Sequence, residues 1–191
     1  MDDIEVWAAV DQRRRAIVEL LRSLDAGEWN TPSLCPGWTV RDVAAHLTMP
    51  VLTMRQIVAL IERSAGHHRA FFGLTCRESL IDAIGHTFDM AIPLGREIHF
   101  PAAVVAEAAD RVVSYHGRGN AKVFRSLPWA SFRLTATDHD WSAGDGPPVT
   151  GTMTDLFLLL TGRDARIDGL LGPGADDLRR AAAACRPGVR R

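Results

Sequence analysis

Two ionisable side chains four residues apart, Asp82 and His86, could hold a divalent metal ion. Residues at positions i and i+4 lie on one face of a helix, so a carboxylate and an imidazole at this spacing can reach one ion. These ligand types suit zinc, nickel, iron or manganese. His46 is the best candidate for a third ligand, because it lies three residues after Val43 at the edge of an apolar helical stripe. The pattern therefore predicts a metal site made of His46, Asp82 and His86.

The same residues also fit a helix without a metal site. Ser79, Asp82, His86 and Asp89 form a polar stripe, and such a stripe is commonly a solvated face. A lone histidine such as His46 is more often hydrogen-bonded or partly exposed than a ligand. We expect the other histidines at the surface: His67, His68, His99, His116 and His139. On the residues alone, both interpretations remain open.

A cluster of aspartates could suggest a calcium site, but its spacing does not match an EF-hand loop. The cluster comprises Asp138, Asp140 and Asp145, in a segment rich in glycine and proline. Turn chemistry explains these residues better, because aspartate side chains readily bond nearby backbone groups.

The elements that must position these side chains are mostly helices. Hydrophobic periodicity predicts helices over 3–25, 40–61 with a bend at Pro50, 77–92, 102–114, 155–161 and 175–184. Thr39 and Asp42 fit a capping box at the start of the second helix. Alternation over 131–137 predicts a strand, and residues 149–150 predict a short return strand. We expect a helical domain over residues 1–125 and a small α/β appendage over residues 126–191.

Charge and hydropathy exclude several classes of protein. The 191-residue chain has 22 basic and 23 acidic residues, so no basic field exists to hold nucleic acid or an anionic membrane. Its longest apolar run, over 156–160, is far shorter than the roughly 20 residues of a membrane-spanning helix. The acidic N-terminus lacks the basic segment of a signal peptide. We therefore expect a cytoplasmic protein whose partners are small molecules, and its oligomeric state stays open.

The chain shows no phosphate-binding loop, no dinucleotide fingerprint and no nucleophile elbow. Its three cysteines, Cys35, Cys76 and Cys185, are widely spaced and form no CxxC motif. This odd number predicts free thiols in a reducing compartment.

Three segments carry a resemblance to a known family. The most specific spans 34–47 and reads LCPGWTVRDVAAHL; the second spans 86–96 and reads HTFDMAIPLGR. The third combines 135–144, TATDHDWSAG, with 151–163. In this order they resemble the mycothiol-dependent maleylpyruvate isomerase family of actinobacteria, which belongs to the DinB-like superfamily. The resemblance covers most of the chain.

This resemblance implies a mainly α fold, a DinB-like four-helix bundle with a small C-terminal α/β appendage (a β-hairpin plus short helices). It also implies a metal at one end of the bundle, held by a histidine on the second helix and an acid-x-x-x-histidine pair on the third. Those positions are His46, Asp82 and His86 here. One departure is Thr87-Phe88, which stands where the family usually has Gly-Gln. Nearby, Asp89 could orient His86, and Trp38 and Arg41 could border the site.

The leading functional hypothesis is a metal-dependent isomerase or S-transferase that uses a mycothiol-type thiol on a small electrophilic molecule. Zinc is the first candidate metal and nickel the second. A catalytic zinc keeps an open position beside three protein ligands, and a thiol bound there is deprotonated at neutral pH. Such a thiolate could add to an activated alkene or displace a leaving group. The alternative is a non-catalytic metal-binding, ligand-sensing or partner-binding module, which a closed and fully ligated site would favour. The sequence identifies no catalytic or cofactor-binding residue beyond the metal ligands.

Overall fold

A computed structural model describes residues 1–48, 53–68, 74–115, 124 and 127–185. Three sequence predictions lie outside these residues: the bend at Pro50, the surface position of His116, and the domain boundary between residues 125 and 126. The chain forms two compact units, residues 1–99 and residues 100–191.

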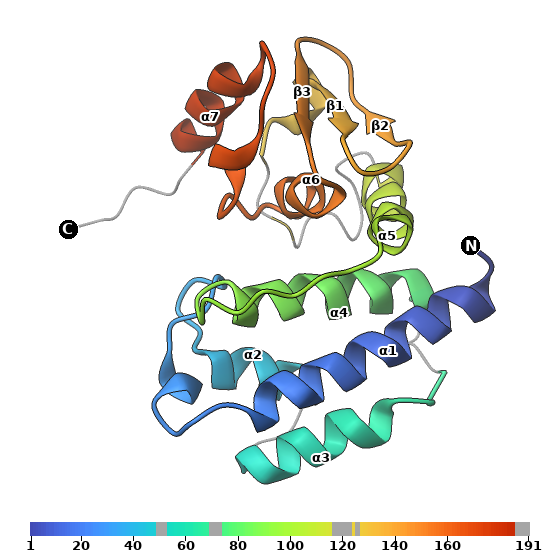
Figure 1. Ribbon diagram of the computed structural model, residues 1–191, viewed down its shortest axis with the longest axis vertical. Helices are drawn as coiled ribbons and strands as arrows, with labels where there is room; N and C mark the ends of the chain where they lie inside the picture. The colour runs from blue at the N-terminus through green and yellow to red at the C-terminus, as the bar shows by residue number, and fades with distance from the viewer. Residues whose placement is uncertain (49–52, 69–73, 116–123, 125–126, 186–191) are drawn as a thin grey trace. The chain divides into compact units, whose positions relative to one another are not determined.

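Within its described residues, the first unit is a bundle of four α-helices, whose arrangement Figure 1 shows. They are α1 (Asp3–Arg22), α2 (Val40–His46), α3 (Met54–Ser64) and α4 (Cys76–Ala91). Helix α1 packs against both α3 and α4, and the short α2 packs against α4 and α3. This arrangement makes α2 and α4 neighbours, although about thirty residues separate them in the chain.

Capping boxes set where each of these helices begins. In each box the cap side chain accepts from a backbone N–H of the first turn, and the third helical residue reaches back to the cap. The pairs are Asp2–Glu5, Thr39–Asp42, Thr53–Gln56 and Thr75–Glu78. The predicted box at Thr39 is therefore confirmed. Because a cap of this kind contributes about 1 kcal/mol, these boxes hold the start of each helix in place.

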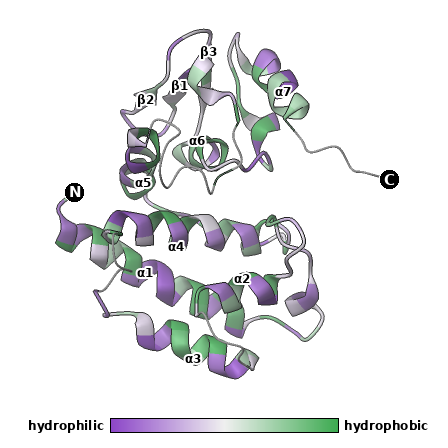
Figure 2. Cartoon of the chain, turned by 180° about the vertical axis from the view of Figure 1, so that it is seen from behind, coloured by the Kyte–Doolittle hydropathy of each residue, from purple (hydrophilic) through white to green (hydrophobic). Residues whose placement is uncertain are grey.

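Apolar side chains from all four helices fill the middle of the bundle. The buried cluster includes Ile17 and Leu21 of α1, Val43 of α2, Ile57 of α3 and Met90 of α4. Figure 2 shows the hydrophilic residues that alternate with hydrophobic ones along α1 and α3. One buried face on each helix is what the 3.6-residue periodicity predicts.

The part of the second unit that the structure describes combines three α-helices with a small sheet. Its helices are α5 (Ala102–Ser114), α6 (Met153–Leu160) and α7 (Ala175–Ala184). Strand β1 (Arg133–Ala136) is central, antiparallel to β2 (Ser142–Ala143) and parallel to β3 (Pro148–Gly151). The sequence did not predict strand β2, which forms a hairpin with β1. The predicted return strand is β3, and it runs parallel to β1.

Helix α6 forms the core of this second unit. It packs against α5 and against strands β1 and β3, and its apolar run from Leu156 to Leu160 is buried. Thr152 caps the helix, and the carboxylate of Asp138 accepts the backbone N–H of Met153 at 2.8 Å. Asp138 therefore acts in local turn and cap chemistry.

The mainly α fold with a small C-terminal α/β part is confirmed. Helices α5 and α7 coincide with their predicted ranges, and the first helix ends at Arg22, three residues before the predicted end. Within the described residues, no helix combines the length and the hydropathy that a membrane crossing requires.

Candidate metal centre

Asp82 and His86 lie one turn apart on α4, as their spacing predicts. The Nε2 atom of His86 lies 3.3 Å from Oδ1 of Asp82. The Asp82 side chain is 53% exposed and the His86 side chain only 13% exposed. The carboxylate thus faces solvent, while the ring of His86 sits mostly inside the protein.

His46 is the last residue of α2 and is exposed. Its ring centroid lies 5.0 Å from that of His86, with the two ring planes at 78°. One ligand atom from each of His46, Asp82 and His86 lies within 4.8 Å of the others. We call these three residues the outer set. Two imidazoles and a carboxylate at this separation fit a zinc-type ion, which takes nitrogen and oxygen ligands at about 2 Å.

The other ring nitrogen of His86 faces a buried carboxylate. Nδ1 lies 2.8 Å from Oδ2 of Asp89, whose side chain is 1% exposed. A metal-ligating histidine commonly donates its second N–H to a carboxylate, which fixes the orientation of the ring. Asp89 is placed to hold His86 with Nε2 directed toward Asp82 and His46.

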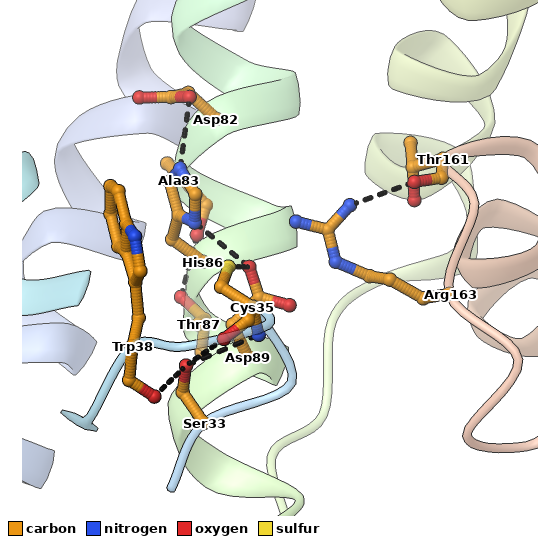
Figure 3. A network of polar contacts seen from close by, with 10 residues as sticks. All are labelled: Ser33, Cys35, Trp38, Asp82, Ala83, His86, Thr87, Asp89, Thr161 and Arg163. Atoms are coloured by element: carbon orange, nitrogen blue, oxygen red, sulfur yellow. Dashed lines mark hydrogen bonds and ion pairs between the residues drawn. The ribbon is translucent and has the colours of Figure 1, made fainter. Parts of the chain in front are cut away.

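Cys35 binds the same carboxylate from a different part of the chain. Its thiol donates to Oδ2 of Asp89 at 3.1 Å (Figure 3). The backbone N–H of Leu34 also donates to the carbonyl of Asp89, at 3.2 Å. These bonds attach the loop before α2 to the last turns of α4.

A tight turn positions this loop. The N–H of Trp38 donates to the carbonyl of Cys35 at 3.0 Å, so residues 35–38 form a β-turn. Pro36 supplies the fixed φ of the second position, and Gly37, with φ of +80°, the positive φ that a type II turn needs at the third. Ser33 secures the loop further, because its N–H and hydroxyl both donate to the carbonyl of Trp38.

The turn places its two ends on different sides of the site. Cys35 reaches Asp89, while the exposed Trp38 meets His46 edge to face, with ring centroids 5.3 Å apart. Trp38 therefore borders the outer set, as anticipated, whereas Arg41 is an exposed residue of α2.

Electrostatics around His86 strongly favour its protonated form. Burial, the largest single effect, lowers the pKa of this ring. Hydrogen bonds with Asp82, Asp89 and the Cys35 side chain, together with the charge of Asp82, outweigh burial and raise the pKa of the ring to about 11. A metal ion must therefore displace a proton from this imidazole, so its binding competes with protonation.

The polar stripe on α4 is not a uniformly solvated face. Asp82 is exposed, but Asp89 is buried and His86 nearly so. Thr87 and Phe88 are buried as well, and the Thr87 hydroxyl donates to the carbonyl of Ala83 at 2.6 Å. The bulk at the Thr87-Phe88 position therefore lies in the interior of the fold.

Sequence reasoning missed the role of Cys35 in this network. Its Pro-Gly neighbours predict the turn, but only the packing of the loop on α4 brings the thiol to Asp89. The three cysteines are free thiols, as predicted. His67, His68, His99 and His139 are exposed, also as predicted.

Comparison with known proteins settles the family. The family model of the mycothiol maleylpyruvate isomerase N-terminal domain matches residues 10–149, which is well over half of the chain. The chain belongs to this family. The matched span contains all three residues of the outer set as well as Cys35 and Asp89. Among curated proteins, none matches the chain.

The fold of this mycothiol maleylpyruvate isomerase family member also has a counterpart among solved structures. A crystal structure of a histidine-to-alanine mutant of the mycothiol-dependent maleylpyruvate isomerase matches with a TM-score of 0.58. The match covers 92% of this chain and 94% of that chain, at 16% sequence identity. At this identity the likeness shows a shared fold, and the family resemblance drawn from the motifs is confirmed.

Proposed function

We propose that this protein is a metal-dependent isomerase or S-transferase that uses a mycothiol-type thiol on a small electrophilic molecule. The observation that carries the proposal is the outer set. His46, Asp82 and His86 bring three ligand atoms within 4.8 Å of one another, and two of these residues are exposed. Membership of the family supports a thiol cofactor and a small substrate.

Exposure of the outer set favours a catalytic role over a structural one. Structural zinc sites are closed by four protein ligands, whereas catalytic sites keep a position for water or substrate. Three protein ligands with His46 and Asp82 at the surface leave room for a fourth, external ligand. This supports catalysis over the alternative of a non-catalytic metal-binding or sensing module.

The chain's own residues would prepare the site in two ways. Asp89 accepts the Nδ1 proton of His86 and so directs Nε2 toward the ion, and Trp38 packs against His46 and limits its rotation. The bound ion, with zinc as first candidate and nickel as second, would supply positive charge that keeps a coordinated thiol ionised at neutral pH. The indole of Trp38 offers an apolar surface beside the position where the thiol and the substrate would meet.

The test combines metal content with thiol-dependent turnover. Purified wild-type protein is compared with His46→Ala and His86→Ala, and with His67→Ala as the control, since His67 is an exposed histidine outside the outer set. We expect about one ion per chain in wild type and control, in line with three-ligand binding. His86→Ala should lose that ion, and His46→Ala should lose the thiol-dependent turnover that the outer set supports. Conversion of activated alkenes and other small electrophiles is then measured with and without a low-molecular-weight thiol. A wild-type protein that takes up neither zinc nor nickel, or that turns over equally well without thiol, would contradict the proposal.

A further inference from the structure

A second group of metal-binding side chains lies on the inner side of His86. One ligand atom from each of Cys35, His86 and Asp89 lies within 4.8 Å of the others. We call these three residues the inner set. Unlike the outer set it contains a thiol, and its carboxylate is 1% exposed. The two sets share His86, because Nε2 faces Asp82 and Nδ1 faces Asp89.

We propose that the inner set is a second metal position, which takes a thiophilic divalent ion such as zinc or cadmium in place of two protons. The position goes beyond the proposed function, since it needs neither His46 nor Asp82.

The hydrogen bonds of the inner set show where such an ion fits. The Cys35 thiol and His86 Nδ1 both lie within hydrogen-bond distance of the same atom, Oδ2 of Asp89, at 3.1 and 2.8 Å. Two protons therefore converge on one carboxylate oxygen. A dication that binds thiolate, imidazole and carboxylate occupies the same place and satisfies the same three groups.

Charge balance makes the exchange reasonable inside the protein. When the ion binds, the thiol and Nδ1 each lose the hydrogen that they direct at Asp89. The ion of charge plus two then has two negative ligands, a thiolate and a carboxylate, and one neutral imidazole. The occupied site has no net charge, so no uncompensated charge is left in a buried place. Nε2 keeps its proton and can donate to Asp82, 3.3 Å away.

The loop that carries Cys35 is already fixed in the geometry that this position needs. The Pro36-Gly37 turn and the bond from Leu34 N–H to the carbonyl of Asp89 hold it on α4. Ligands that are held before binding lose little freedom when the ion arrives. The thiolate selects borderline and soft ions and rejects magnesium and calcium, which prefer oxygen.

The inner and outer positions exclude each other. An ion on Nδ1 leaves the proton on Nε2, so the outer set loses its central ligand, and an ion on Nε2 leaves the Nδ1 proton with Asp89. We therefore expect one ion per chain at either position. A thiophilic ion in the inner set would switch off whatever the outer set does.

Cobalt distinguishes the two positions, because a thiolate ligand adds an intense near-ultraviolet charge-transfer band that nitrogen and oxygen ligands do not produce. The protein is stripped of metal, and Cys185→Ser removes the exposed thiol from every variant. His46→Ala, or separately Asp82→Asn, then disables the outer set. We expect both variants to bind one cobalt ion per chain with the thiolate band. Adding Cys35→Ser should abolish the band and weaken binding at least tenfold, while circular dichroism shows an intact fold.

Three results would overturn the inner position. They are cobalt bound without the band in both outer-set variants, no cobalt bound in either, or a band that survives Cys35→Ser and so belongs to the buried Cys76. The outer set is judged separately in the Cys35→Ser variant. If the Cys35→Ser variant binds cobalt without a thiolate band, the outer set is supported, whatever the result for the inner set. If this variant binds no cobalt, the outer set is wrong, but the inner set is not affected.

Discussion

Asp11 on α1 and Asp89 on α4 are both buried aspartates that bind a histidine. Asp11 is 6% exposed and its Oδ2 lies 3.0 Å from Nε2 of His68; for Asp89 and His86 Nδ1 the distance is 2.8 Å. The two pairs look alike in chemistry. They differ in what surrounds the histidine.

His68 has a structural surrounding, because its contacts join the segment after α3 to α1. Its ring stacks on Trp7, with centroids 5.3 Å apart and planes at 11°, and its side chain is 50% exposed. Asp11 also accepts the N–H of Gly66 at 2.8 Å, and Arg14 donates to the carbonyl of Ser64 at 2.7 Å. Together these bonds attach the segment after α3 to α1.

His86, by contrast, lies next to further side chains that can bind a metal. Its second nitrogen meets Asp82, and His46 lies beside it, so its ring connects a buried carboxylate to an exposed metal-type set. A buried Asp–His pair is therefore not by itself a sign of function. What matters is whether the histidine's other nitrogen is offered to more ligands.

The largest expected difference between the pairs is in metal binding. His86→Ala should lose the bound ion entirely, because His86 belongs to both ligand sets, whereas His68→Ala should keep it. Elemental analysis of both purified variants measures this. If the two variants retain equal amounts of metal, the distinction between the pairs is wrong.

A smaller effect is expected from the carboxylates. Asp89→Asn keeps the side-chain shape but removes the charge that holds the Nδ1 proton of His86, so zinc affinity in the outer set should fall by about 10- to 100-fold. Asp11→Asn is the matched control and should leave zinc affinity unchanged. Competition with a zinc-sensitive dye gives both values. An unchanged affinity in Asp89→Asn would mean that this carboxylate does not orient the ligand.

Asp11→Asn should change the stability of the fold although it leaves zinc affinity unchanged. Asp11→Asn weakens the bonds to His68 and the Gly66 N–H in a buried place, so the free energy of unfolding should fall by about 1–3 kcal/mol. Denaturant unfolding of metal-free protein measures this, with His67→Ala as a surface control. A change no larger than that of the control would show that the segment after α3 is held by other contacts.

The smallest expected effect is on pH dependence. The two pairs should lose their contributions to stability at opposite ends of the pH scale. Burial raises the pKa of Asp11, but the Gly66 N–H, His68 and Arg14 outweigh it and lower the pKa below 3.8. Its contribution to stability is present above that value and is lost as the pH falls through the folded-state pKa. The pKa of His86 is raised from 6.5 to about 11, so its contribution is complete below 6.5 and is lost as the pH rises toward 11.

Melting temperatures of metal-free protein across pH check this pair of statements. The difference in melting temperature between wild type and Asp11→Asn should become smaller in acid. The difference between wild type and His86→Ala should become smaller in alkali. Parallel curves for the wild type and either variant would contradict the assignment for that residue.

Local rules in the sequence determined much of this molecule. The i, i+4 spacing puts Asp82 and His86 on one face of α4, since helix geometry depends only on neighbouring residues. The Thr39–Asp42 capping box starts α2, and Pro36-Gly37 dictates the turn before it. These features need no distant partner, so the pattern of residues is sufficient to predict them.

Tertiary packing decided the rest. Cys35 and Asp89 are 54 residues apart, and the sequence offers no signal that joins them. The same holds for Asp11 and His68, which are 57 residues apart. Which buried faces meet depends on how the whole core fills its space. Helix spacing puts Asp82 and Asp89 beside His86, but packing decided that Asp89 is buried while Asp82 stays exposed.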